Sequence, residues 1–183
     1  MAIPKKVLRH LEKKKVRYER VAHKTVYTAY DLAQTLREKL ASVAKTLAVK
    51  VDNDHVLVIL PGDRRLDLSK LKKMLKAKKA ELTSERVMAK VFKVKPGEVT
   101  PFGTLHKNAP VLIDKALVGA KKVFASAGSF EESLHLSVKE LLKATEAKIG
   151  RFSEKAKLKL QVNIKKTKVR RKTLKKRRSG IKK

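Results

Sequence analysis

Apolar residues recur along this chain with two different spacings, and each spacing predicts one kind of element. Repeats every three or four residues favour helices, whereas alternation of apolar and polar residues favours strands. The helical spacing predicts helices near residues 4–11, 29–36, 66–75, 84–92 and 138–144. Short apolar or alternating runs predict strands at residues 17–22, 45–51, 55–60, 111–114, 122–127 and 133–137.

The ends of several elements carry their own signals. Thr28 followed by Asp31 resembles a capping box, and Ser137 with Glu140 has the same S-x-x-E pattern at the start of the last helix. The turn residues at 52–54 join two strands and predict a hairpin, which the Pro-Gly pair after residue 60 ends. Strands and helices interleave without a regular βαβ repeat. We therefore expect one α/β (α+β) domain with a mixed sheet over residues 1–147.

Charge sets the last fifth of the chain apart. The 183 residues include 48 Lys and Arg against 17 Asp and Glu, which gives a formal net charge of +31. About half of this excess lies in residues 148–183, where Glu154 is the one acidic residue. Such a charge indicates a polyanionic partner, nucleic acid before an anionic membrane surface. We place a boundary near residue 147, between the domain and a polybasic extension.

The extension itself has two parts. Residues 156–164 alternate apolar and polar side chains and are a possible extra strand. Residues 165–183 form a basic run with few apolar residues, which we expect to be disordered on its own. One interpretation is an arm that binds RNA through its phosphates, and the other is a solubilising or targeting tail. For RNA binding the candidate residues are Arg170, Arg171, Lys172, Lys175, Lys176, Arg177 and Arg178.

Several classes of chemistry have no support in the sequence. The chain has no cysteine, so thiol nucleophiles and thiolate metal sites are excluded. The five histidines do not pair at metal-ligand spacing, and neither phosphate-binding loops nor hydrolase motifs occur, so we expect no metal and no cofactor. The longest apolar run, residues 56–60, is too short to cross a bilayer. We expect a cytoplasmic protein without a membrane partner.

Lys45 is the first candidate site residue. It shares strand parity with Leu47 and Val49, so it faces the interior if those residues do, whereas Lys50 faces outward. Burial would disfavour its charged form, or the charge could be aimed into a pocket. Alternatively, Lys45 precedes the strand proper and its amine simply reaches solvent.

A second candidate is the stiff, nearly neutral loop KPGEVTPFG at residues 95–103. Gly97 allows the backbone to approach a ligand closely, and Pro101 fixes its own φ and biases Thr100 toward extended geometry. A loop of this kind can hold backbone N–H groups at fixed positions, as a site that stabilises an oxyanion requires. An ordinary turn is the other interpretation.

Five segments, in order and spacing, resemble the YbaK/ProX family of aminoacyl-tRNA editing domains. They are AKTLAVKV (44–51), VLVILPGDRRLDLSKL (56–71), GEVTPFG (97–103), PVLID (110–114) and ASAGSFEESLHLSVKELL (125–142). The resemblance covers about residues 1–145. It implies a mixed, partly barrel-like sheet flanked by helices around a central pocket. It also implies hydrolysis of the ester that joins a wrong amino acid to tRNA, by water and without a covalent intermediate.

The resemblance assigns roles to individual residues. Lys45 matches the family's characteristic lysine, implied to contact the substrate end. The G-x-x-x-P loop, implied to hold the aminoacyl group, matches Gly97, Glu98, Val99, Thr100 and Pro101. The region of Ala127, Gly128 and Ser129 resembles a wall for the terminal adenosine. Ser126 and Asp114 are further candidate substrate contacts, and Asp114 matches a common aspartate of less defined role. Glu98 departs from the pattern, because the loop often begins with two glycines, and this departure leaves the identity of the substrate open.

These patterns favour a free-standing trans-editing aminoacyl-tRNA deacylase. Alanine or cysteine on proline tRNA are the family's commonest substrates, and serine or threonine are alternatives. The implied partner is mischarged tRNA, with an aminoacyl-tRNA synthetase as a further candidate, and the oligomeric state is open. The alternative function is a non-catalytic RNA- or ribosome-binding module that reuses the editing fold. The presence of both Lys45 and the Gly97–Pro101 loop favours the enzyme.

Overall fold

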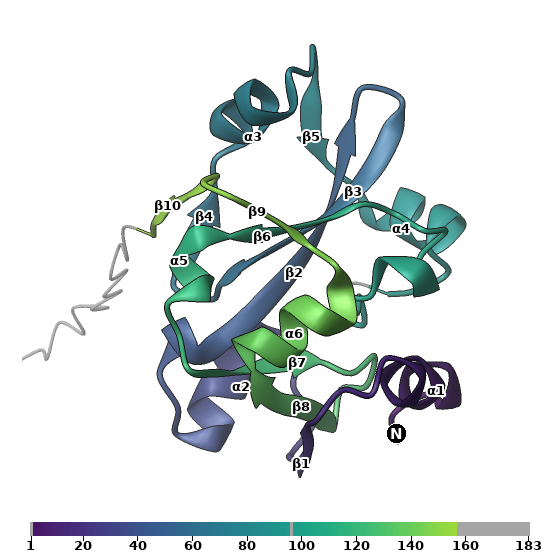
Figure 1. Cartoon of the computed structure of the whole chain (residues 1–183), viewed down its shortest axis with the longest axis vertical. Coiled ribbons are helices and arrows are strands. Elements are labelled where there is room, and N and C mark those ends of the chain that lie inside the picture. Colours follow the sequence, from purple (N-terminus) through teal and green to yellow (C-terminus); the bar gives the residue numbers. More distant parts are fainter. Residues whose placement is uncertain (1, 96, 157–183) are drawn as a thin grey trace, which may run out of the picture.

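The computed structural model describes residues 2–95 and 97–156, which form a large mixed sheet, a small two-stranded sheet and helices packed around them (Figure 1). The helices are α1 (Lys5–Lys13), α2 (Ala29–Leu36), η1 (Leu40–Ser42), α3 (Leu68–Leu75), α4 (Glu85–Val91), η2 (Gly103–Leu105), α5 (Lys115–Val118) and α6 (Val138–Thr145). The strands are β1 (Glu19–Ala22), β2 (Val43–Val51), β3 (Asp54–Pro61), β4 (Arg64–Leu66), β5 (Ala80–Leu82), β6 (Val111–Asp114), β7 (Lys122–Ser126), β8 (Glu132–Ser137), β9 (Lys148–Gly150) and β10 (Ser153–Lys155). No helix within the described ranges is long and apolar enough to span a membrane.

The sheet has eight strands in the order β1-β8-β7-β2-β3-β6-β9, and β5 pairs with β2 beside this path. β2 and β3 form the predicted antiparallel hairpin, whereas β2–β7, β3–β6 and β6–β9 are parallel. β4 and β10 form a separate two-stranded sheet. In Figure 1, α3 and β5 lie at one end of the molecule and α1 and β1 at the other. The predicted α/β class with a mixed sheet is confirmed.

The central hairpin divides the interior into two clusters by strand alternation. Ala44 and Ala48 of β2 pack with Leu57 and Ile59 of β3 in the larger cluster, which α1, α4 and α6 cover. The intervening positions of the same strands, such as Val49, face a second cluster. Successive side chains of a strand point to opposite faces, so a strand with apolar residues at both parities is covered on both sides.

The sequence signals at the helix ends are largely present in the structure. The Thr28 hydroxyl accepts from the N–H of Asp31, and the Asp31 carboxylate accepts from the N–H of Thr28, both at 3.1 Å. Ser137 likewise caps α6 by accepting from the N–H of Glu140 at 3.2 Å. The Glu140 carboxylate, however, accepts from the N–H of Arg17 at 2.9 Å, so it joins α6 to the segment before β1.

The ordered sheet extends past the boundary that composition predicts at residue 147. β9 pairs with β6, β10 pairs with β4, and the fully buried Phe152 between them packs in the second cluster. Strand pairing therefore reaches Lys155, and sequence analysis did not find β9 and β10 because the alternation of a three-residue strand is too short to stand out against a basic background. The possible strand at 156–164 lies, after Ala156, outside the described residues.

Asp114, one of the predicted substrate contacts, holds this C-terminal part in place. The residue is buried at the end of β6. One carboxylate oxygen accepts from the N–H of Ala116 and caps α5, and the other accepts from the N–H of Phe152, both at 2.8 Å. Without this carboxylate, both N–H groups would lose their hydrogen-bond acceptor, which is costly inside a protein.

We expect Asp114→Ala to lower the free energy of unfolding by about 2–4 kcal/mol, because two backbone donors lose their acceptor. Asp114→Asn should cost less, since its amide keeps one accepting oxygen. Urea unfolding measures both changes, with Glu38→Ala at an exposed carboxylate as the control. Equal stability of the Asp114→Ala and Glu38→Ala variants would contradict this role.

Candidate active site

A cavity of about 240 Å³ opens at one edge of β2. On this edge β2 pairs with β7 through Val43 and Ala44, and with β5 through residues 49–51. The residues between these two ladders, including Lys45, Thr46 and Leu47, line the cavity. The first turn of α2, the loop at residues 97–99 and the end of β7 form the other walls. The cavity thus occupies the gap between two strands that share one edge of β2.

Five of the predicted site residues line this cavity: Lys45, Gly97, Val99, Ser126 and Ser129. The sheet explains how they meet although they are far apart in the chain. The parallel register joins Ala44 to Ala125, which places Lys45 and Ser126 next to each other along neighbouring strands. Ser126 also reaches the loop, because its hydroxyl lies 3.5 Å from the carbonyl oxygen of Gly97 and accepts from the N–H of Gly128.

The other predicted residues lie elsewhere. Glu98, Thr100 and Gly128 line a neighbouring cavity of about 250 Å³ beside α1. The Glu98 carboxylate accepts from the N–H of Lys95 at 3.0 Å and so closes the turn that begins the loop. Pro101, in the same loop, is buried. Asp114 is the structural acceptor described above, and the seven basic residues between 170 and 178 lie outside the described residues.

Glycine is required at residue 97 for two reasons. Its φ is +88°, a backbone conformation that other residues rarely adopt. A Cβ atom there would also lie 3.0 Å from the carbonyl oxygen of Tyr27 and from the Phe130 ring. The loop backbone therefore lies too close to the segment before α2 and to Phe130 to leave room for a side chain at residue 97.

A buried hydrogen bond holds the loop from its other side. The Thr100 hydroxyl and the His106 Nε2 are 2.9 Å apart, and both residues are buried. Burial, with a smaller contribution from the charge of Lys6, lowers the pKa of His106 to about 4, while a hydrogen bond with the Thr100 backbone acts in the opposite direction. The imidazole is therefore neutral at pH 7, and it fixes the loop without adding charge.

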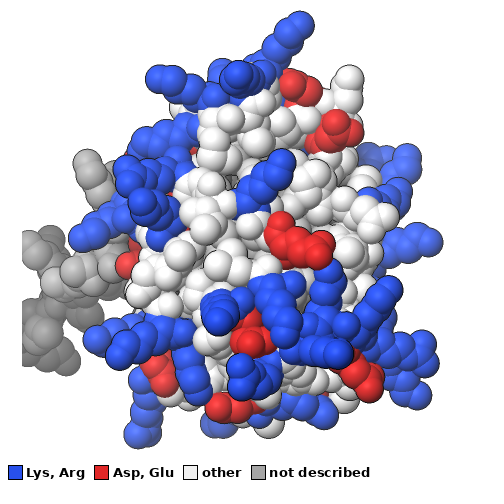
Figure 2. Space-filling view, viewed as in Figure 1, with Lys and Arg blue, Asp and Glu red and all other residues white. Residues whose placement is uncertain are grey.

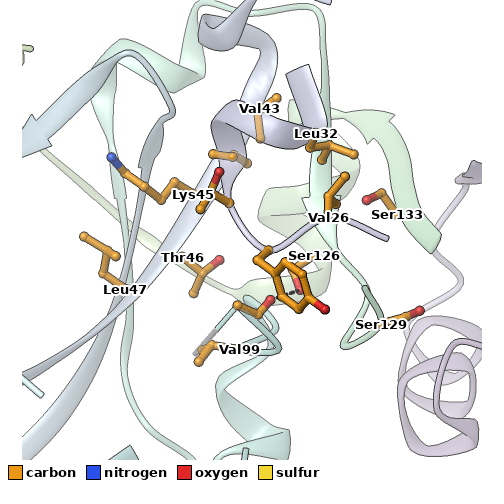
Figure 3. Close-up of a pocket in the computed structure, with 15 residues that line it drawn as sticks. Val26, Leu32, Val43, Lys45, Thr46, Leu47, Val99, Ser126, Ser129 and Ser133 are labelled. Atoms are coloured by element: carbon orange, nitrogen blue, oxygen red, sulfur yellow. Dashed lines mark hydrogen bonds between the residues drawn. The ribbon is translucent and has the colours of Figure 1, made fainter. Parts of the chain in front are cut away.

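Lys45 is half-buried, and its amine has one defined partner. Nζ donates to the carbonyl oxygen of Arg64 at 2.8 Å. Burial lowers the pKa of Lys45, an effect that the charge of Asp63 opposes. Figure 3 shows the side chains of Lys45 and Leu47 on the same side of β2, with the amine pointing away from Val99 and Ser126. The stem of Lys45 forms a wall of the cavity, and its charge lies at the margin.

Thr46, which sequence analysis did not single out, presents more polar groups to the cavity. Its hydroxyl oxygen is buried without a hydrogen-bond partner in the described part of the chain. Strand alternation places it opposite Lys45, on the side where Figure 3 shows Val99 and Ser126. The sequence did hold one signal for Thr46: it is next to the candidate Lys45 in the predicted strand, so its side chain must point to the opposite face.

The backbone of Thr46 faces the same gap. The carbonyl of Val43 accepts from the β3 side, from Gly62, whereas the carbonyl of Ala48 accepts from Thr83 on the β5 side. Because backbone groups of a strand alternate between its two edges, Thr46 shares the edge of Ala48. Its N–H and C=O groups therefore point to the cavity, between the two ladders.

The cavity can hold a small, mostly apolar group by fixed polar contacts. Val26, Leu32, Val43 and Val99 supply apolar walls, and Lys45 and Tyr27 are the titratable residues among those that line it. Within the described ranges no group of three or more His, Asp or Glu side chains is placed to bind a metal ion. The available chemistry is hydrogen bonding to a ligand, exclusion of bulk water and one nearby cation.

The chain is similar to known proteins in both sequence and structure. The chain is 28% identical over 151 residues to the prolyl-tRNA editing protein ProX of Acetoanaerobium sticklandii, which covers 80% of this chain and 92% of that protein. It is 31% identical over 117 residues to the proline–tRNA ligase of Fervidobacterium nodosum, a match to 64% of this chain but 20% of the ligase.

Two solved structures share the fold at 24% identity. The hypothetical protein APE2540 superposes with a TM-score of 0.76 over 81% of this chain and 99% of its own. A protein proposed to be a trans-editing enzyme for prolyl-tRNA synthetase superposes with a TM-score of 0.73 over 82% of this chain and 96% of its own. Residues 23–144, which include the cavity and its loop, match the aminoacyl-tRNA editing domain family. The chain therefore belongs to the aminoacyl-tRNA editing domain family.

Proposed function

We propose that this protein is a trans-acting deacylase that hydrolyses the ester bond of mischarged aminoacyl-tRNA. The observation that carries this proposal is the small cavity between the open edge of β2 and the fixed loop at Gly97. A family of editing domains and a cavity with backbone groups aimed into it both support ester hydrolysis by water. Such an enzyme would act in the cytoplasm, where tRNA is charged.

The size and lining of the cavity favour a small amino acid. A synthetase pocket discriminates against a substrate smaller by one methylene by only about 1–3 kcal/mol, so smaller amino acids are sometimes attached in error. A second site that admits only small groups can remove them. Apolar walls such as Val26, Leu32 and Val43 suit alanine or cysteine, and the similarity to ProX points to proline tRNA as their carrier. Serine or threonine are alternatives that the hydroxyl of Ser126 would favour.

Thr46 and the loop would perform the chemistry by position. The hydroxyl and backbone N–H of Thr46 would bind the ester or the attacking water, and the backbone of the Gly97–Pro101 loop would hold the aminoacyl group. Lys45 would place its charge at the margin of the cavity, where a terminal phosphate of the tRNA would lie. Its bond to the Arg64 carbonyl keeps that charge in one position.

Electrostatics would deliver the tRNA. Lys and Arg side chains surround the face shown in Figure 2, and acidic side chains form only small groups among them. We propose that residues 157–183, which add 14 Lys and Arg and no acidic residue, act as an arm that binds tRNA phosphates. The alternative, a non-catalytic RNA- or ribosome-binding module, rests on the same charge and differs in lacking hydrolysis.

The central test is deacylation of tRNA carrying alanine, cysteine, serine or threonine, measured as release of the labelled amino acid. We expect Lys45→Ala to abolish activity, and Thr46→Val to lower it about 10- to 100-fold through one lost hydrogen bond. Thr46→Ser keeps the hydroxyl and should retain most of the activity. Lys50→Ala, at the exposed lysine of the same strand, is the matched control.

A folded Lys45→Ala variant with full activity would defeat the assignment of Lys45. Wild-type protein that binds these tRNAs but hydrolyses none of them would establish the binding module in place of the enzyme.

His106 predicts how stability depends on pH. Its folded pKa of about 4 lies below the ordinary value of 6.5, so between these values the unfolded chain binds more protons. Stability should be complete above about pH 6.5 and should fall as the pH drops toward 4, by at most about 1.4 kcal/mol per unit.

Urea unfolding from pH 7 to 5.5 measures this slope and stays above the range in which carboxylates such as Glu132, with an ordinary pKa of 4.5 in the unfolded chain, begin to bind protons. His106→Gln should flatten the slope. Burial also lowers the pKa of His55, so His55→Gln measures how much that residue contributes to the slope. An unchanged slope in His106→Gln would contradict the prediction.

Truncation after residue 156, which keeps β10, should weaken tRNA binding at low salt and flatten its salt dependence, because each phosphate contact adds to the slope. A full-length variant with glutamine at Arg170, Arg171, Lys172, Lys175, Lys176, Arg177 and Arg178 should show most of the same loss. Filter binding at several salt concentrations measures both. Equal affinity and equal slope for the truncated and full chains would exclude the arm.

A further inference from the structure

The chain contains few aromatic residues, and they differ widely in exposure: Tyr18 and Phe130 are partly buried, and the others are either buried or exposed. Of its five phenylalanines and three tyrosines, Phe92, Phe102, Phe124 and Phe152 are buried. Tyr27 and Tyr30, in contrast, are 65% and 57% exposed. The burial of large rings stabilises a fold, so rings left in water contribute little to it. The two tyrosines therefore call for an explanation other than core packing.

Both tyrosines lie at the start of α2, beside the cavity. Tyr27 is one of the residues that line it, and Thr28 and Ala29 after it continue the same wall. Tyr30 follows in the first turn of the helix and is exposed. The exposed aromatic surface thus adjoins the mouth of the cavity that we propose as the reaction site.

The support beneath Tyr27 is rigid. Its ring packs on Phe130 with centroids 5.0 Å apart and planes inclined by 51°. Its carbonyl oxygen lies against Gly97, and the next residue, Thr28, is fixed by the reciprocal capping bonds with Asp31. A ring held in this way loses little conformational freedom when a ligand binds to it.

The volume of the cavity leaves part of the substrate outside. Pockets that enclose a drug-sized ligand have about 300–1,000 Å³. The cavity has about 240 Å³, which suits an aminoacyl group but not an aminoacyl group together with a nucleoside. If the proposed function is correct, the terminal base of the tRNA must lie at the mouth, where the two tyrosines are exposed.

We propose that Tyr27 and Tyr30 form a stacking platform for the unpaired bases at the 3′ end of tRNA. Unpaired bases are recognised in proteins mainly by stacking on aromatic side chains, and every base offers a face for this contact. The formal charge of +31 favours a nucleic acid over a protein as the occupant. The platform would hold the terminal adenine while the ester enters the cavity.

The test uses binding of uncharged tRNA, so it does not depend on hydrolysis. Affinities of the full chain are measured for intact tRNA and for the same tRNA without its last two nucleotides. The wild type should prefer intact tRNA by about 5- to 150-fold per stacked base. Tyr27→Ala/Tyr30→Ala should remove this preference and leave binding of trimmed tRNA unchanged. Tyr27→Phe/Tyr30→Phe keeps the ring faces and should behave as wild type.

Leu82→Ala, at an exposed apolar residue of β5, serves as the matched surface control and should keep the wild-type preference. The platform is overturned if the wild type binds both RNAs equally, or if the double alanine variant retains the preference. It is also overturned if that variant weakens both RNAs by the same factor. A wild type that prefers intact tRNA but hydrolyses no ester would support the platform and defeat the deacylase.

Discussion

The interrupted edge of β2 is the constraint on which the rest of this molecule depends. One edge of a strand normally meets a single neighbour, but here β7 covers its first two residues and β5 its last three. The backbone and side chain of Thr46 are left between them, in an interior where unpaired polar groups are costly. A ligand that supplies hydrogen bonds is the natural partner for such a gap. The fold itself thus creates the cavity, without a dedicated catalytic motif.

Two contacts that carry no charge help to hold the loop opposite that gap. Gly97 lies against the backbone before α2, and Thr100 is bound to a neutral histidine. A further charged group here would attract water and counter-ions into a cavity that we propose selects small apolar groups. In this proposal the strongly basic surface and the nearly neutral loop serve two tasks, attraction of a polyanion and selection of a small group.

The sequence predicted the larger elements well because their signals are local. The hairpin of β2 and β3, the capping box at Thr28 and the helix after Ser137 follow from patterns within a few residues. β4, β5 and α5 were missed, since segments of three or four residues are too short to show a period.

The candidate site was predictable in part for a similar reason. Lys45 and Gly97 could be found from resemblance and parity, whereas the orphan hydroxyl of Thr46 depends on which strands flank β2. Asp114 is a further example. Its position matches an aspartate of the family, but its hydrogen bond with the N–H of Phe152 could not be predicted from that match. Contacts between residues distant in the chain are set by topology, which no local pattern encodes.

The pairing of β10 with β4 has a geometric consequence for the basic segment that follows. The N–H of Ala156 donates to the carbonyl oxygen of Asp63, one residue before the carbonyl that holds the Lys45 amine. The last described residue is therefore anchored beside the Lys45 amine, at the margin of the cavity. If the basic segment binds RNA as we propose, this anchor would keep the RNA at a high effective concentration near the opening, so that binding and entry would be steps of one intramolecular search.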